Sequence, residues 1–348
     1  MARKSHNTSP APKRNEYLQL VKPIVEFFEK RNLPVIAKRE KNTGRILYGS
    51  DEFGVSPTRG EIMRVDVLAF QWNAHGRVVS KAVEAKLYQG SPAQSVGYAL
   101  RQAASYQVLF NEVYVAVEKG KIGYYESMLS DLGLGLIFVD NSSNVEVQLE
   151  PKPSRRFSMK EYRRQVVPRL VPPLAFLEVF GPPIKFGLTR DGQLYAVKEL
   201  ADPKLHIQFN AGVADGDKAR SYIGFNLEHK NAFRAILRKK PDIATISRML
   251  KELVSNGYEV TLVKVPNPHP KNARDVPIKL ADKTNAKEIF RKVKPVLEKD
   301  SGFRPHLAIY KEFLQIGQDI SREEALQLTR EAVAEISPLS SYVCELLK

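Results

Sequence analysis

The sequence is poor in cysteine and histidine. Cys344 is its only cysteine, so an internal disulfide and any zinc site built from several cysteines are excluded. The six histidines are scattered along the chain, with no pair at the spacing typical of metal ligands. The composition therefore excludes disulfide-stabilised and cysteine-zinc proteins, and it fits a reducing cytoplasm.

Long apolar runs are absent too. No run approaches the roughly 20 residues that a membrane-spanning helix needs, and the first residues, MARKSHNTSPAPKRN, hold no apolar segment like that of a signal peptide. The chain also has no glycine-rich phosphate loop and no nucleophile-elbow motif. We therefore expect a cytoplasmic protein with no membrane partner, for which a separate motor subunit would have to supply any ATP-driven translocation.

Positive charge is in excess. Lys and Arg number 54 against 39 Asp and Glu, which gives a formal net charge of +15. A charge of this sign and size favours an anionic partner, either nucleic acid or a membrane surface. The length of 348 residues and the hydrophobic content of 43% predict two domains, each with its own core.

The first domain is expected over residues 15–150, after a disordered basic arm at 1–14. Its pattern of alternating and helical apolar spacing predicts an α/β sandwich around a central mixed sheet. A turn at 73–76 joins two of the strands into a hairpin. The expected helices are 18–28 and 93–110, and the expected strands are 34–40, 61–72, 77–87, 113–117 and 134–140.

A basic, proline-rich linker is expected over residues 151–180, followed by a second, α+β domain over 181–348. This domain has no motif that names its role, and substrate recognition or dimerisation are both open. Its last helix is predicted to begin with a capping box formed by Ser321 and Glu324. A run of basic residues is usually a solvated face, but it can also bind the phosphates of a nucleic acid. The candidate phosphate contacts of the linker are Arg155, Arg156, Arg163 and Arg164.

The stretch VEAKL, residues 83–87, places two opposite charges in an apolar strand. Side chains alternate along a strand, so Glu84 and Lys86 share one face, and Asp66 on the preceding strand comes beside Glu84. Two buried carboxylates need a compensating cation. Mg²⁺ suits them, with the Ala85 carbonyl as a further ligand and Mn²⁺ as a substitute. Lys86 would then position a water that attacks a phosphodiester; the alternative is a structural salt bridge.

An acid on one hairpin strand followed by Glu-x-Lys on the next resembles the core of the PD-(D/E)xK nuclease superfamily, over residues 15–150 only. Val65 stands where the family name has proline. The resemblance implies a restriction-endonuclease-like fold and Mg²⁺-dependent hydrolysis of DNA, with catalytic roles for Asp66, Glu84 and Lys86.

The helix after the hairpin adds to the likeness. Gln102 and Tyr106 lie four residues apart on one helical face and are similar to the Gln-x-x-x-Tyr element of several branches of the superfamily. The alternative for Tyr106 is a plain core aromatic. An acid from the first helix sometimes joins the metal site in this superfamily, but Glu16 and Glu26 are both expected to be solvated.

Two further interpretations stay open. The protein could be a DNA-binding or scaffolding protein whose chemistry has lapsed, although a lapsed site has no physical reason to keep a costly charge cluster. The basic surface could also serve RNA, for which the sequence has no aromatic recognition motif. A homodimer is plausible because one such site cuts one strand.

Overall fold

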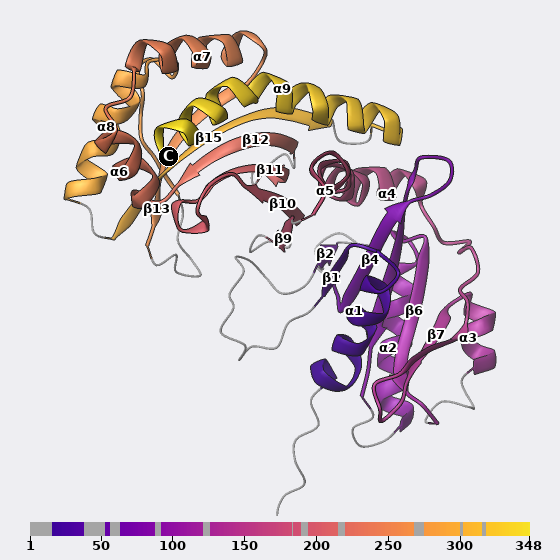
Figure 1. The fold of residues 1–348 in the computed structure, drawn as a ribbon. Helices are drawn as coiled ribbons and strands as arrows, with labels where there is room; N and C mark the ends of the chain where they lie inside the picture. The colour runs from indigo at the N-terminus through magenta and orange to yellow at the C-terminus, as the bar shows by residue number, and fades with distance from the viewer. Residues whose placement is uncertain are drawn as a thin grey trace, which may run out of the picture.

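The chain is a mixed α/β protein with two main sheets in its described part (Figure 1). The computed structural model describes residues 16–37, 53–55, 63–87, 92–120, 126–182, 184–188, 194–214, 220–267, 275–299, 302–314 and 318–348. Within these ranges, no helix is long and apolar enough to cross a membrane. The basic arm expected at 1–14 lies outside the described residues.

The first sheet is mixed, as predicted. Its strand order is β1-β4-β5-β6-β7-β8, with β6 parallel to both β5 and β7 and antiparallel pairing elsewhere. The parallel pairs are joined through helices, because a parallel connection needs a crossover. The strands are β1 (Val35–Ala37), β4 (Val67–Trp72), β5 (Val78–Ala85), β6 (Glu112–Glu118), β7 (Gly135–Val139) and β8 (Val145–Leu149).

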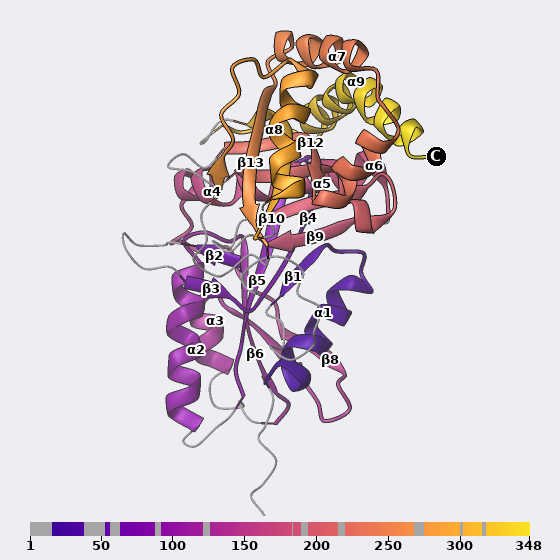
Figure 2. The same ribbon diagram turned by 90° about the vertical axis from the view of Figure 1, so that its left-hand side faces the viewer.

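Helices cover both faces of this sheet (Figure 2). The π-helical turn η1 (Tyr17–Val21) and α1 (Lys22–Glu29) pack on the face that carries Val83 and Ala85. The helices α2 (Pro92–Tyr106) and α3 (Glu126–Leu132) contact β5, β6 and β7, and α2 packs on the face that carries Ala82. The strict alternation in β5 therefore directs Glu84 toward α2.

The strand predicted over 61–72 is interrupted at Asp66. Residues before it form β3 (Met63–Val65), which pairs with β2 (Phe53–Val55) in a separate two-stranded sheet. Residues after it form β4, which pairs with β5. Asp66 lies at the bend between the two strands. The bend places its carboxylate at the edge where the main sheet begins.

The second sheet is antiparallel throughout, with the strand order β14-β13-β15-β12-β11-β10-β9. The predicted capping box is confirmed: Ser321 and Glu324 open α9. The strands are β9 (Lys185–Leu188), β10 (Leu194–Glu199), β11 (Ile207–Ala214), β12 (Arg220–Glu228), β13 (Glu259–Pro266), β14 (Val276–Pro277) and β15 (Phe303–Leu314). Its helices are α6 (Lys230–Arg238), α7 (Ile243–Ser255), α8 (Ala286–Glu298) and α9 (Arg322–Leu346), with a short 3-10 turn η2 (Pro203–Leu205).

The expected linker over 151–180 is wrong for its second half. Residues 159–165 form α4 (Met159–Gln165), and residues 167–180 form α5 (Val167–Phe180), in which ten successive residues from Val167 to Phe176 are buried. This helix packs against β10, β11, β12 and α9 and also touches β4 and β5. The prolines suggested a linker, but the apolar residues between them form a helix shared by the two sheets.

The hairpin turn after β4 makes a second connection between the halves. The Arg322 backbone N–H donates to the Gly76 carbonyl at 2.9 Å, and the Arg322 guanidinium pairs with Glu178 of α5 at 2.7 Å. Gly76 has a φ of +67°, and a Cβ there would lie 3.3 Å from the Arg322 Cβ. The left-handed backbone and the close approach both favour glycine at this position.

The burial of α5 predicts that it stabilises the whole molecule. We expect Phe176→Ala to lower the free energy of unfolding by about 3 to 5 kcal/mol, because it removes a fully buried ring. Met159→Ala, in the neighbouring helix but exposed, should change it by less than about 0.5 kcal/mol. Urea denaturation measures both, and an equally small effect of the two changes would restore the linker interpretation.

Candidate active site

The two acids singled out in the sequence lie side by side. Val67 pairs with Val83 at the end of the β4–β5 ladder, so Asp66 and Glu84 follow just beyond its last pair. The Asp66 carboxylate accepts a hydrogen bond from the Ala85 backbone N–H at 2.9 Å. Asp66 is 6% exposed and Glu84 is 3% exposed. The predicted adjacency of the two carboxylates is confirmed.

This arrangement holds Glu84 neutral in the metal-free protein. Burial, and next the neighbouring Asp66 carboxylate, raise the pKa of Glu84 to about 9, although Tyr106 and Lys86 oppose the shift. A buried carboxylate without a cation keeps its proton, because the charged form loses its hydration.

Tyr106 connects this acid to the rest of the domain. Its ring is fully buried on α2, and its hydroxyl lies 2.6 Å from the Arg64 carbonyl oxygen and 3.0 Å from Glu84 Oε2. The Tyr106 hydroxyl donates, its single hydrogen facing both acceptor oxygens, and its contact with the carboxylate opposes the rise in the pKa of Glu84. Tyr106 is thus both a core aromatic and a polar contact of the site.

Gln102 lies one helical turn before Tyr106. Its Oε1 atom is buried and has no hydrogen-bond partner among the described residues. A buried acceptor without a donor costs free energy. Gln102 therefore has an unused hydrogen-bonding capacity on the helix face that also carries Tyr106.

Lys86 follows the last residue of β5. Its backbone N–H donates to the Ala116 carbonyl at 2.9 Å, and its Nζ lies 5.1 Å from the ring centroid of Tyr98 on α2. Within the described part of the chain, the ammonium forms no ion pair with either acid. The structural salt bridge considered from the sequence is therefore not formed, and the charge of Lys86 stays available.

Glu16 is the residue that the sequence analysis missed. It was expected to be solvated, but it is partly buried, and its Oε2 accepts a hydrogen bond from the Leu87 N–H at 3.3 Å. Its charge also contributes to the raised pKa of Glu84. The π-helical winding of residues 17–21 changes the phase of the first helix, which a wheel of 3.6 residues per turn does not anticipate. Glu26 is exposed, as expected.

The basic residues of 151–164 lie away from the acids. Tyr162 of α4 donates to the Val78 carbonyl at 2.7 Å, and Val78 begins β5, whereas Glu84 is its next-to-last residue. At about 3.3 Å per residue, the two positions are separated by roughly 20 Å along the strand. Ion pairs link Arg163 to Asp319 at 2.5 Å and Arg164 to Glu161 at 2.6 Å. Arg155 and Arg156 are exposed, and the described residues offer them no ion pair.

Histidines that are distant in the sequence gather at one corner of the second sheet. The rings of His206 and His229 lie 5.6 Å apart, and His306 Nε2 lies 3.5 Å from Glu228 Oε1. Residues 206 and 229 both have a positive φ, of 50° and 82°. No group of three or more His, Cys, Asp or Glu side chains in the described ranges is arranged to hold a metal ion. The corner therefore gives no alternative metal centre.

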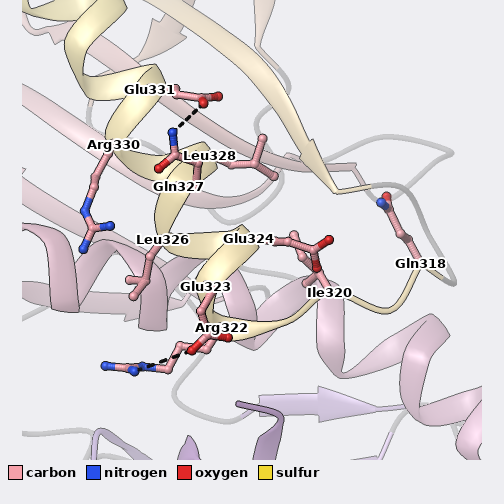
Figure 3. A pocket seen from close by; sticks show the side chains of 10 residues that line it. All are labelled: Gln318, Ile320, Arg322, Glu323, Glu324, Leu326, Gln327, Leu328, Arg330 and Glu331. Carbon is pink, nitrogen blue, oxygen red and sulfur yellow. Dashed lines mark hydrogen bonds and ion pairs between the residues drawn. The ribbon is translucent and has the colours of Figure 1, made fainter. Parts of the chain in front are cut away.

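A hollow of about 820 Å³ lies beside the start of α9 (Figure 3). Its polar side chains largely satisfy one another: Gln327 donates to Glu331 at 2.7 Å, and Glu324 accepts from the Ser321 N–H at 2.9 Å. This part of the helix carries residues of both charges: Arg322, Glu323, Glu324, Arg330 and Glu331. The hollow has no converging set of catalytic groups, unlike the pair of acids under α2.

The raised pKa of Glu84 has a consequence for stability in the metal-free protein. Its folded-state value of about 9 exceeds the ordinary 4.5. The bound proton therefore stabilises the fold fully below the unfolded-state pKa, and this contribution is lost as the pH rises through the folded-state pKa. Glu84→Gln removes the titration, so the variant should gain relative to wild type as the pH rises.

In chelator, we expect this gain to be about 3 kcal/mol between pH 5.5 and pH 8, measured by urea denaturation. Glu26→Gln, at an exposed acid, serves as the control and should show no such trend. A difference between Glu84→Gln and wild type that does not vary with pH would contradict a neutral, buried Glu84.

Comparison with known proteins gives no relative from which a role could be carried over. No protein-family model matches the chain, and neither a curated protein nor a solved structure matches it. The chemistry of the Asp66–Glu84 pair and its neighbours is therefore the basis for assigning a function.

Proposed function

We propose that this protein is a Mg²⁺-dependent deoxyribonuclease that hydrolyses DNA phosphodiester bonds. The observation that carries the proposal is the pair of buried carboxylates, Asp66 and Glu84, near the Lys86 ammonium, which forms no ion pair with either acid in the described part of the chain. A structural charge cluster would be expected to pair its charges internally. In this cluster the pKa of Glu84 is raised and, among the described residues, Lys86 forms no ion pair, which suits a site completed by a cation and a phosphate.

The donor set fits Mg²⁺. This ion prefers one or two carboxylates together with water and phosphate oxygens, and Asp66, Glu84 and the Ala85 carbonyl are the groups that would hold it, with Mn²⁺ as a substitute. When bound, the ion would supply positive charge that lowers the pKa of water and offsets charge developing on the phosphate. The proton that Glu84 carries in the metal-free protein has to leave when the ion binds.

The remaining residues have separate tasks. Lys86 holds and polarises the attacking water near the phosphate, since its ammonium has three donors and forms no ion pair with a described acid. Tyr106 keeps the Glu84 carboxyl in place through its hydroxyl, and Gln102 offers its amide to the water or to the substrate. Glu16 adds a third negative charge near the pair and fixes the chain after β5 through the Leu87 N–H.

The topology supports a restriction-endonuclease-like core. The acids lie on the antiparallel hairpin β4–β5, and α2 then leads to β6, which is parallel to β5. The net charge of +15 supports a polyanionic substrate. In this proposal, residues 181–348 help to hold the DNA. Pairing of two copies would provide a cut in each strand.

Cleavage assays test the proposal directly. Circular, linear and branched DNA would be incubated with wild type and with Lys86→Ala, in Mg²⁺, in Mn²⁺ and in chelator. We expect metal-dependent cutting by wild type and a loss of about 10²-fold or more in the variant, with DNA binding retained. Lys294→Ala, at an exposed lysine of α8, should cut like wild type. Absence of cutting by wild type in either metal, together with equal DNA binding by all three proteins, would favour a lapsed, DNA-binding protein.

The exposed arginines of 151–164 predict a salt-dependent contribution to binding. The double change Arg155→Ala and Arg156→Ala removes up to two phosphate contacts, so the slope of log affinity against log salt should fall by about 2. Arg164→Ala should leave the slope nearly unchanged, because Arg164 already pairs with Glu161. Fluorescence anisotropy with labelled DNA at several salt concentrations measures both slopes. Equal slopes for the double variant and wild type would show that Arg155 and Arg156 do not contact DNA phosphates.

A further inference from the structure

One face of α2 carries side chains that contact the charged residues at the end of β5. Tyr98, Gln102 and Tyr106 are spaced by four, so they align along one side of the helix. Tyr106 contacts Glu84, and Tyr98 contacts Lys86 through its ring. The helix therefore provides one aromatic residue for each of the two charged residues of VEAKL.

Packing does not explain Tyr98. It is 48% exposed, whereas the next residues, Ala99 and Leu100, belong to the hydrophobic core. Apart from its place in the helix, the contact that the structure gives its ring is the Lys86 ammonium, with Nζ 5.1 Å from the centroid. This distance is within the range of a cation–π interaction.

The position of the ammonium is unexpected on electrostatic grounds. Lys86 lies on the side of the strand that faces the acid pair, and the Asp66 carboxylate beside Glu84 is a stronger partner for an ammonium than an aromatic face. An ion pair of Lys86 with Asp66 or Glu84 would neutralise the charge that a divalent cation needs. It would also direct the ammonium away from the solvent boundary, where Tyr98 now holds it.

We propose that Tyr98 is a positioning residue that holds the Lys86 ammonium away from the Asp66–Glu84 pair. Both carboxylates thereby remain available to a cation, and the ammonium stays at the side of the site that faces solvent. This role rests on the proposed nuclease function. It adds to the proposed site Tyr98, a residue that neither touches the acids nor belongs to the hydrophobic core.

Two substitutions separate this role from a structural one. Tyr98→Leu removes the aromatic face and keeps an apolar side chain of moderate size, whereas Tyr98→Phe keeps the face and removes only the hydroxyl. The first readout is the affinity for Mn²⁺ without DNA, from the electron paramagnetic resonance signal of the free ion. The second readout is kcat and KM for DNA cleavage.

We expect Tyr98→Leu to weaken Mn²⁺ binding by about tenfold, because the released ammonium competes for the carboxylates. The value of kcat should fall by a similar factor, with little change in KM. Tyr98→Phe should restore most of both. In a Lys86→Met background there is no ammonium to release, so Tyr98→Leu should leave the Mn²⁺ affinity unchanged.

Two results would overturn the inference while leaving the nuclease function intact. One is a Tyr98→Leu protein that binds Mn²⁺ and cuts DNA like wild type. The other is an equal loss of Mn²⁺ affinity in the presence and absence of Lys86, which would mean that Tyr98 acts through the fold. Wild-type protein that neither binds Mn²⁺ nor cuts DNA would instead overturn the proposed function and this role with it.

Discussion

The structure depends at its centre on the burial of two carboxylates side by side. Asp66 and Glu84 lie between the sheet and α2, where charge is poorly hydrated, and the metal-free protein resolves the conflict by keeping a proton on Glu84. The surrounding groups follow from that constraint: the Ala85 N–H donates to Asp66, and the Tyr106 hydroxyl meets Glu84. In the proposed function, a divalent cation would take the place of that proton and offset the charge of both carboxylates.

The positions of the acids and of their neighbours on α2 are set mainly by the course of the backbone. The bend at Asp66 divides one predicted strand into β3 and β4, so the first acid lies where the main sheet begins. The parallel β5–β6 pair then brings α2 across the sheet, with Tyr106 near Glu84 and Tyr98 near Lys86. A single helix thus contacts both charged residues of the strand. The arrangement places the acids in the interior and the lysine near its edge.

The second half of the chain is joined to the first through shared packing. The helix α5 is buried between the second sheet and α9 and reaches β4 and β5, and Arg322 connects the turn at Gly76 to Glu178. A shared core of this kind resists relative motion of the two sheets. The helix α4, which carries Arg163 and Arg164, lies near the start of β5, at the opposite end from the acids. A DNA path that used both places would have to extend along the length of the strand.

The sequence by itself determined the elements and the charges of the site. Period-two alternation placed Glu84 on one face of its strand, the spacing of Gln102 and Tyr106 placed both on one helix face, and Ser321 with Glu324 marked the start of α9. These are local properties, set by a few neighbouring residues.

Only the tertiary structure decided what depends on distant partners. Glu16 contacts Leu87 from the other end of the domain, Tyr98 receives the Lys86 ammonium, and residues 167–180 become a buried helix because two sheets pack on them. Composition and residue spacing describe one segment by itself and do not indicate which distant segments pack against it. The burial of α5 and the neighbours of Glu84 are set by the rest of the fold.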